Sequence, residues 1–262
     1  MKQIPSPPLL SCHELTRRFG GLVALDRLSF DLPEGEILGL IGPNGSGKTT
    51  FFNVLTGLYP ASAGEIRFAG ERITHLRPQQ IHRTGIARTF QRSRLCLPLS
   101  VFDNIMIGNH TRLDHGPGTN LFRRSALRRQ LEKSFEEARE LLRIFDPALV
   151  DRLLAAVAGI PLIERRRIEI CRALISRPRL LLLDEPSAGM TREETARLMD
   201  DILEVKRRFG QLTVILIEHQ MAVIQQCTER CIVLDYGRKV CEGAYADVAA
   251  NPLVQQAYLG MS

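Results

Sequence analysis

The 262-residue sequence has no continuous apolar run of about 18 residues, the length that a membrane-spanning helix needs. It therefore predicts no transmembrane segment, and any work at a membrane would depend on other chains. Leu9-Leu10-Ser11-Cys12 looks like a lipoprotein cleavage box. The preceding Ile4-Pro5-Ser6-Pro7-Pro8 is not an apolar signal core, so we expect no lipid anchor.

The sequence also has no C-x-x-C pair among its six cysteines. Cys227 and Cys231 would share one face of a helix, but no matching pair of histidines or cysteines follows them. We therefore expect reduced thiols in a cytosolic protein rather than a zinc site or disulfides.

A basic tail is absent as well, although the net charge is +6. On charge alone the partner could be an acidic protein, an anionic membrane surface or a nucleic acid. The arginine clusters lie in segments patterned as amphipathic helices, which is typical of a solvated surface. We expect no nucleic-acid partner. The length suits one α/β domain, or one domain with a subdomain.

The clearest motif begins as an apolar run at Glu36 and continues into a glycine loop and a helix start. Its glycines permit backbone angles that let N–H groups face phosphate oxygens, and the positive end of the helix adds to this. Lys48 is predicted to reach the β- and γ-phosphates, and Thr49 to offer its hydroxyl to Mg²⁺. A turn that binds nothing is the alternative, which the strand before and the helix after disfavour. The predicted phosphate-loop residues are Gly42, Pro43, Asn44, Gly45, Ser46, Gly47, Lys48, Thr49 and Thr50.

Two further buried strands end in polar residues. Four consecutive leucines, 180–183, precede Asp184 and Glu185 and fit a strand buried on both faces. We predict that Asp184 holds Mg²⁺ through water and that Glu185 orients the attacking water, against the alternative of an exposed acidic turn. Residues 213–219 predict a second such strand, whose final residue, His219, would touch the γ-phosphate from the same sheet edge.

Two single residues are weaker candidates. Phe19 lies before a turn at Gly20-Gly21, between strands predicted at 10–15 and 22–32, and could stack on a base or belong to the core. Gln91 ends a strand predicted at 86–91; its amide could reach a metal or the metal's water, or simply face solvent.

Helical patterns dominate the middle of the chain. Residues 121–145 and 163–174 carry apolar residues three or four apart, and 191–208 predicts a helix capped by Thr191 and Glu194. We predict an α/β fold in a single domain, 1–262. Its core would be 1–90 and 178–262, and 91–177 an inserted helical subdomain. Residues 232–243 predict a closing hairpin, and 251–260 a final helix.

Together these motifs resemble the ATP-binding subunits of ABC transporters over nearly the whole chain. The resemblance implies a P-loop NTPase core with a mostly parallel sheet, an antiparallel β subdomain and an inserted helical subdomain. It also implies that the enzyme is an ATPase using ATP and Mg²⁺. The roles it implies are adenine stacking for Phe19, Walker A for Gly42 to Thr50, Q-loop nucleotide and metal contact for Gln91, Walker B for Asp184, catalytic base for Glu185, D-loop for residues 187–190 and switch histidine for His219.

Finer features are similar to one branch, the branched-chain amino acid (LivG-type) importers. They are Arg88-Thr89-Phe90-Gln91, Ala188-Gly189-Met190, Ile217-Glu218-His219, Leu234-Asp235-Tyr236-Gly237 and Ala257-Tyr258-Leu259-Gly260. The branch implies a second ATPase, two transmembrane permeases, a periplasmic solute-binding protein and a peripheral place at the cytoplasmic face of the inner membrane. Alternatives are a non-hydrolysing regulatory or scaffold subunit, an ABC protein acting on nucleic acid or ribosomes, and a lipopolysaccharide-export ATPase.

One segment departs from that branch. Residues 160–164 are Ile-Pro-Leu-Ile-Glu where the family signature is L-x-Y-G-Q. Ile163 replaces the glycine whose N–H faces the γ-phosphate held by the opposite subunit. We hypothesise that this chain hydrolyses ATP when a partner lends an intact signature, that the reciprocal site is weak, and that the working unit is a heterodimer.

Overall fold

The computed structural model describes residues 7–91, 93–112 and 124–259. Contacts divide the chain into two compact units. The first comprises residues 1–88, 179–186 and 206–262, and the second comprises 89–178 and 187–205. The sequence predicts subdomain boundaries after residues 90 and 177. The structure divides the chain after residues 88 and 178, and it also assigns residues 187–205 to the second unit.

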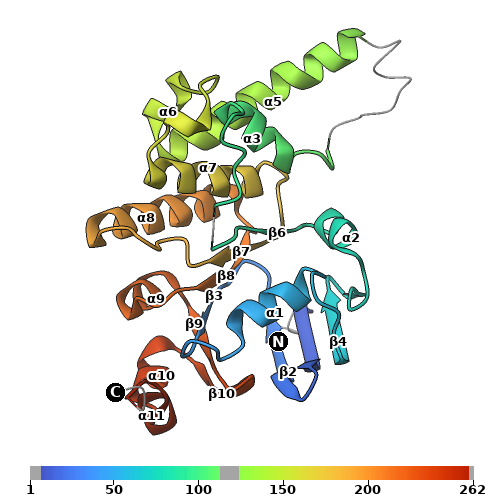
Figure 1. The fold of residues 1–262 in the computed structure, drawn as a ribbon, viewed down its shortest axis with the longest axis vertical. Helices are drawn as coiled ribbons and strands as arrows, with labels where there is room; N and C mark the ends of the chain where they lie inside the picture. Colours follow the sequence, from blue (N-terminus) through green and yellow to red (C-terminus); the bar gives the residue numbers. More distant parts are fainter. Residues whose placement is uncertain (1–6, 92, 113–123, 260–262) are drawn as a thin grey trace, which may run out of the picture. The chain divides into compact units, whose positions relative to one another are not determined.

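The first unit is built on a six-stranded sheet of order β10-β9-β3-β8-β7-β6 (Figure 1). β6, β7, β8, β3 and β9 run parallel, and β10 pairs with β9 as the predicted antiparallel hairpin. Every residue of β3, β7 and β8 is buried, as expected of strands covered on both faces. The bounds are β3 (Ile37–Ile41), β6 (Ile86–Arg88), β7 (Leu180–Asp184), β8 (Thr213–Ile217), β9 (Arg230–Asp235) and β10 (Arg238–Gly243).

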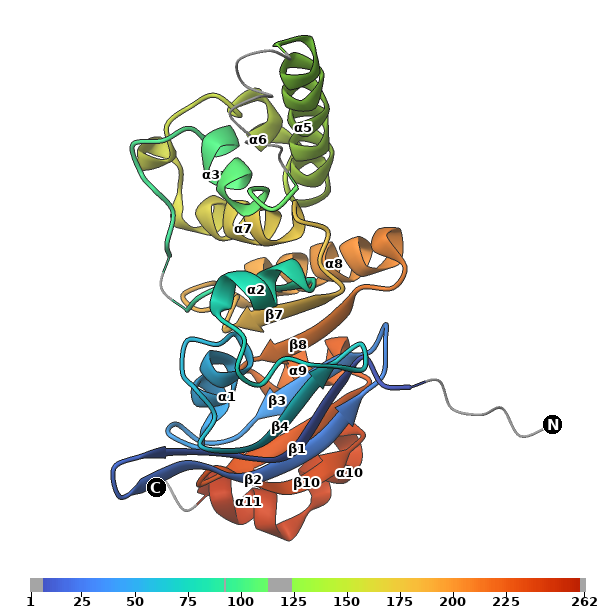
Figure 2. The same ribbon diagram turned by 90° about the vertical axis from the view of Figure 1, so that its right-hand side faces the viewer.

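A second, antiparallel sheet of order β2-β1-β4-β5 belongs to the same unit (Figure 2). It comprises β1 (Leu10–Phe19), β2 (Leu22–Leu32), β4 (Ala63–Phe68) and β5 (Glu71–Arg72). Helix α1 (Lys48–Leu55) contributes Phe51 and Phe52 to one hydrophobic core shared with residues of both sheets. That shared core holds the helix that starts at the phosphate loop. The unit's other helices are α2 (Pro78–Arg83), α9 (Met221–Cys227), α10 (Tyr245–Ala250) and α11 (Pro252–Leu259).

The second unit is helical. Helix α3 approaches α7 so closely that a Cβ on Gly108 would lie 1.8 Å from the carbonyl oxygen of Arg172. The predicted cap of α8 is present, since Thr191 and Glu194 exchange side-chain and backbone hydrogen bonds. The elements are α3 (Val101–Gly108), α5 (Arg124–Phe145), α6 (Pro147–Asp151), a 3₁₀ turn (Val157–Gly159), α7 (Leu162–Leu174) and α8 (Arg192–Phe209), of which residues 192–205 lie in this unit.

Two strand predictions change in length. The predicted antiparallel strands around Gly20-Gly21 are confirmed, but β1 continues to Phe19 through register shifts. The prediction that β6 reaches Gln91 is wrong: pairing with β7 stops at Arg88, and from Thr89 the chain belongs to the second unit. The first residues of the predicted 121–145 helix lie outside the described residues.

All six cysteines are unpaired, which agrees with the prediction of free thiols. Burial raises the pKa of Cys12 and of Cys171 far above the ordinary thiol value. Among the residues that the structure describes, no helix has both the length and the apolarity to span a bilayer.

Candidate active site

Three neighbouring parallel strands bring the predicted polar residues to one edge of the sheet. Leu40 of β3 and Asp184 of β7 both lie in register with Ile217 of β8. The loop after β3, Glu185 after β7 and His219 after β8 therefore begin at the same level. The backbone N–H of Glu185 also donates to the Ile217 carbonyl at 3.0 Å, which extends this register beyond the strand.

The loop between β3 and α1 has the close packing that its glycines allow. A Cβ on Gly42 would lie 2.1 Å from the Leu234 carbonyl oxygen, and one on Gly47 would lie 2.7 Å from that of Ala24. Both have positive φ, 147° and 108°, which side chains disfavour. Larger residues at either position would push the loop away from the strands behind it.

Lys48 carries the positive charge of this loop. Its Nζ donates to the carbonyl oxygens of Gly42 at 2.7 Å and Pro43 at 2.9 Å, and only 6% of the residue is exposed. Burial lowers the pKa of Lys48, while the carboxylates of Glu185 and Asp184 act in the opposite direction. The ammonium is thus electrostatically coupled to the predicted catalytic base, Glu185, and to the predicted metal residue, Asp184.

The loop offers donors suited to an anion. Ser46 is 2% exposed, and its Oγ has no hydrogen-bond partner among the residues that the structure describes, although burying such a hydroxyl unpaired is costly. Helix α1 begins at Lys48 with Gly47 as its cap and no side-chain cap, so its first N–H groups are available to a ligand. A phosphate group would satisfy these donors.

Asp184 is the end of β7 and is almost fully buried. Its Oδ2 accepts from Nη2 of Arg88 at 2.6 Å, and Nη1 of Arg88 donates to Asn53 Oδ1 at 2.7 Å. Burial raises the pKa of Asp184, and the hydrogen bond from Arg88 opposes that rise. No role for Arg88 or Asn53 at this site could be predicted from the sequence, because no local pattern links either residue to Asp184, which lies 96 positions after Arg88.

Glu185 and His219 lie in direct contact. Nε2 of His219 is 2.7 Å from Oε1 of Glu185. An ionised carboxylate can only accept, so the imidazole donates from Nε2 to it. Glu185 also has φ of 49°, an unusual left-handed backbone for a residue other than glycine. This carboxylate is therefore held by both its backbone and its histidine partner.

The residues at this edge fit Mg²⁺ by their chemistry. Thr49 and Asp184 supply a hydroxyl and a carboxylate oxygen, the hard ligands that Mg²⁺ prefers. Among the described residues no group of three histidine, cysteine or acidic side chains could form a metal cage. Mg²⁺ is commonly bound through one or two protein oxygens together with substrate phosphates, and Thr49 and Asp184 can supply two such oxygens.

Phe19 lies at the surface rather than in the core, at 38% exposure. The guanidinium of Arg17 lies 4.3 Å from its ring centroid, and the ring of Tyr59 meets it edge-on at 5.2 Å. These contacts hold the ring, while its exposed part can take a planar partner. Neither Arg17 nor Tyr59 carries a motif by which the sequence could have identified it.

Gln91 and the atypical signature segment belong to the second unit. The carbonyl of Gln91 accepts from Arg166 at 3.0 Å. Ile160 is buried and Pro161 is the cap of α7, so the segment before the helix is well fixed. Arg165 strengthens this by donating to the carbonyl oxygen of Ile160 at 2.7 Å.

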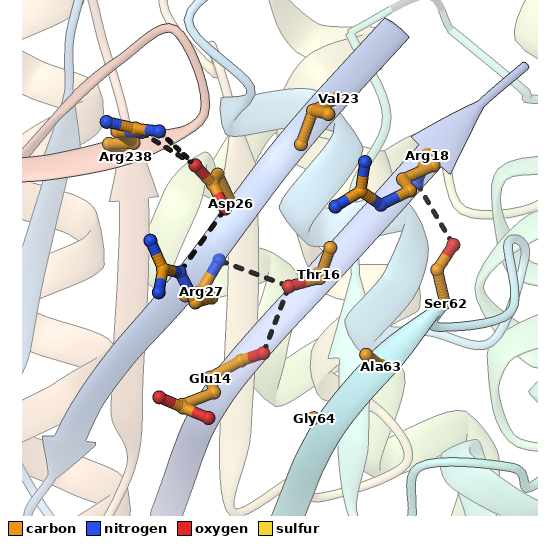
Figure 3. Close-up of a pocket in the computed structure, with 10 residues that line it drawn as sticks. All are labelled: Glu14, Thr16, Arg18, Val23, Asp26, Arg27, Ser62, Ala63, Gly64 and Arg238. Carbon is orange, nitrogen blue, oxygen red and sulfur yellow. Dashed lines mark hydrogen bonds and ion pairs between the residues drawn. The ribbon is translucent and has the colours of Figure 1, made fainter. Parts of the chain in front are cut away.

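A pocket of about 670 Å³ lies on the antiparallel sheet, lined by none of the predicted phosphate-loop residues (Figure 3). Arg238 and Arg27 both pair with Asp26 there. The hydrogen bond from Arg238 is the main cause of the lowered pKa of Asp26. Arg27 and Arg238 are thus already paired with an acid of the chain.

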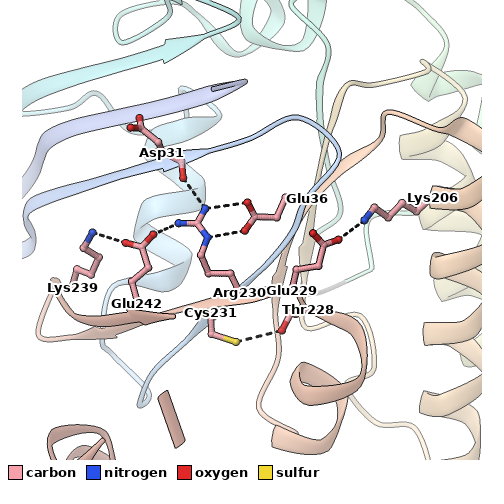
Figure 4. Close-up of polar contacts among 9 residues, drawn as sticks. All are labelled: Asp31, Glu36, Lys206, Thr228, Glu229, Arg230, Cys231, Lys239 and Glu242. Carbon is pink, nitrogen blue, oxygen red and sulfur yellow. Dashed lines mark hydrogen bonds and ion pairs between the residues drawn. The ribbon is translucent and has the colours of Figure 1, made fainter. Parts of the chain in front are cut away.

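Arg230 fixes the start of β3, the end of the strand that lies away from the phosphate loop (Figure 4). Its guanidinium donates to both carboxylate oxygens of Glu36, at 2.8 and 3.2 Å, to the Asp31 carbonyl at 2.7 Å and to Glu242. Because Glu36 immediately precedes β3, this cluster fixes the start of the strand whose other end carries the phosphate loop.

Two family models match parts of the chain. A family model described as ABC transporter matches residues 25–188, well over half of the chain. A second, described as a branched-chain amino acid ATP-binding cassette transporter, matches residues 238–260.

Curated relatives are similar along their whole length. The high-affinity branched-chain amino acid transport ATP-binding protein LivG of Salmonella typhimurium is 36% identical over 97% of this chain and 99% of its own. The corresponding BraF protein of Pseudomonas aeruginosa gives the same values. Among solved structures, the ADP conformation of MJ1267, an ATP-binding cassette of an ABC transporter, has a TM-score of 0.83 at 28% identity, covering 97% of this chain and 100% of that one.

Proposed function

The chain belongs to the ABC transporter family and to its branched-chain amino acid branch, and from this premise we propose how its residues power import. It is an ATP-hydrolysing subunit that drives uptake of branched-chain amino acids or related small amides and acids. The observation that carries the mechanism is the 2.7 Å contact of Glu185 with His219, at the sheet edge from which the Lys48 loop also begins.

Binding is assigned to the loop and the helix that follows it. Backbone N–H groups from Gly42 to Thr50, with Ser46, surround the phosphates, and Lys48 exchanges its two carbonyl partners for β- and γ-phosphate oxygens. Phe19 stacks on the adenine, with Arg17 and Tyr59 holding its ring.

Hydrolysis is assigned to Glu185 and His219. Glu185 accepts a proton from the water whose oxygen attacks the γ-phosphorus, and the bond from that phosphorus to the β–γ bridging oxygen breaks. His219 keeps the carboxylate oriented through its Nε2–H. We propose that it also contacts the γ-phosphate. The products are ADP and inorganic phosphate.

Thr49 and Asp184 are proposed to hold Mg²⁺, Asp184 through water, and Gln91 is the third residue that the sequence predicts for this role. The bound cation would neutralise charge on the phosphates. Arg88 already donates to Asp184 in the structure, and this hydrogen bond opposes the rise in the pKa of Asp184 that burial causes.

The partners are proposed from membership of the branched-chain amino acid branch and from the atypical signature segment that contains Ile163. ATP hydrolysis drives two transmembrane permeases, to which a periplasmic solute-binding protein delivers the solute. The chain lies peripherally at the cytoplasmic face of the inner membrane. Ile163 stands at the signature position that faces the opposite subunit's nucleotide. A second, similar ATPase with an intact signature is therefore proposed to complete the site built on Lys48 and Glu185.

The test is binding of a fluorescent ATP analogue with Mg²⁺ to the full chain. Lys48→Ala should weaken binding by at least about tenfold, because the loop loses its only ammonium and the buried charge that phosphate matches. Lys133→Ala, an exposed change on α5, is the matched control and should bind as the parent does. Equal affinity of Lys48→Ala and the parent would refute the site.

A further inference from the structure

The contact of Arg88 with Asp184 is a buried ion pair inside the proposed metal site. The two side chains are 5% and 2% exposed, and Nη2 lies 2.6 Å from Oδ2. Charges in such a place are stable only when paired and hydrogen-bonded, and removing one partner leaves the other uncompensated. Arg88 is therefore the counter-ion of Asp184 in the structure described.

Arg88 is itself fixed from two further directions. Its second branch, Nη1, donates to Asn53 Oδ1 at 2.7 Å, and its guanidinium lies 5.2 Å from the ring centroid of Phe52. Both partners belong to α1, the helix that starts at Lys48. A guanidinium held by its planar fork loses little freedom when it pairs with a carboxylate. The arginine thus joins β6, β7 and α1.

In the absence of nucleotide, a divalent cation that approaches Asp184 would encounter the ion pair of Arg88 with Asp184. To bind Asp184 it must share a carboxylate whose charge a neighbouring cation already neutralises, and two like charges would then lie together in a low-dielectric place. With nucleotide present, the phosphate charges attract the cation and outweigh the cost. The geometry thus favours entry of the metal together with nucleotide.

We propose that Arg88 excludes free divalent cations from Asp184 until nucleotide arrives, and so couples metal binding to nucleotide binding. This inference rests on the proposed function, because Asp184 is a metal residue only there. Arg88 is a positioning residue in this account, because it acts through Asp184.

The experiment titrates Mn²⁺ into the nucleotide-free full chain and measures free Mn²⁺ by electron paramagnetic resonance. The parent should leave Mn²⁺ free, whereas Arg88→Met should bind it about tenfold or more tightly, within the range usual for coupled sites. Arg88→Gln, which can still contact Asn53, is the second charge-free variant. Arg83→Met removes an exposed positive charge from α2 and should behave as the parent.

Two further variants locate the effect. Arg88→Lys keeps a cation beside Asp184 and should still exclude Mn²⁺. Adding Asp184→Asn to Arg88→Met should abolish the new binding. The idea is overturned if the parent binds Mn²⁺ without nucleotide as tightly as Arg88→Met, or if both charge-free variants are folded by circular dichroism yet bind no more than the parent.

A binding assay with fluorescent ADP distinguishes failure of this inference from failure of the proposed function on which it rests. The parent and the Arg88 variants should bind the fluorescent nucleotide, and Lys48→Ala should not. If the parent binds ADP but the charge-free Arg88 variants bind Mn²⁺ no more tightly than the parent does, only the counter-ion role fails. If the parent binds no nucleotide, the proposed function itself fails.

Discussion

Nε2 of His219 lies 2.7 Å from Oε1 of Glu185, so the residue after β8 directly restrains the residue after β7. The backbone of Glu185 is already in a strained left-handed conformation, at φ 49°. Strand pairing and this hydrogen bond together aim one carboxylate at the sheet edge. The catalytic role assigned to Glu185 depends on that orientation.

Replacing His219 should therefore affect turnover more than binding. His219→Ala removes the donor to Glu185, and we expect kcat to fall about tenfold or more while KM for ATP changes little. His219→Gln keeps a donor and should lose less. His75→Ala, at an exposed position, is the control for loss of an imidazole. A raised KM with unchanged kcat in His219→Ala would mean that the histidine only binds substrate.

The signature segment predicts dependence on a partner. The purified chain alone should hydrolyse ATP slowly, because Ile163 replaces glycine in the proposed signature segment, and adding a second ATPase with an intact signature should raise the rate. Ile163→Gly should raise the activity of the mixed complex through its second site. The measurement is steady-state release of phosphate. Brisk hydrolysis by the isolated parent, or a mixed complex unaffected by Ile163→Gly, would contradict the heterodimer.

A pH effect on stability is expected from the second unit. Burial raises the pKa of Asp201 from 3.8 to about 6, while Arg167 lowers it and Asp200 and Asp146 raise it. The folded state therefore binds the Asp201 proton more tightly than the unfolded state does. The free energy of unfolding consequently falls as pH rises from about 4 to about 6. One pKa unit is worth about 1.4 kcal/mol, so the full shift would correspond to about 3 kcal/mol, and the loss is smaller than this because the carboxyl is partly exposed and solvent screens it.

Urea unfolding at several pH values measures this contribution. Asp201→Asn should remove that part of the pH dependence, whereas Asp200→Asn, at the exposed neighbouring position, should retain most of it. A parent and an Asp201→Asn variant with the same slope between pH 4 and 6 would show that this carboxyl titrates normally.

The sequence predicts the parts of the site whose chemistry is local. The glycine spacing around Lys48 requires a tight loop, and four leucines before Asp184 require a buried strand, so both features follow from neighbouring residues. The cap of α8 by Thr191 and Glu194 is equally local, and the structure contains it. Parallel strand ends then place the polar residues at one edge.

What the sequence leaves open depends on contacts between distant segments. Arg88 pairs with Asp184 only because β6 lies beside β7, and Arg230 reaches Glu36 only because β9 lies beside β3. The early end of β6 likewise follows from where one unit gives way to the other. Periodicity and composition contain no information on these neighbours, so the counter-ion of the proposed metal residue appears only in the fold.

The most direct test of the account is hydrolysis by the transport complex carrying Glu185→Gln in this chain. ATP binding should be retained, since Lys48 and the phosphate loop are unchanged, and the hydrolysis rate of the site built on this chain should fall about 100-fold or more, the scale of a lost general base. Glu71→Gln, at an exposed position of β5, should hydrolyse as the parent does. Hydrolysis at the parental rate by Glu185→Gln would contradict the account.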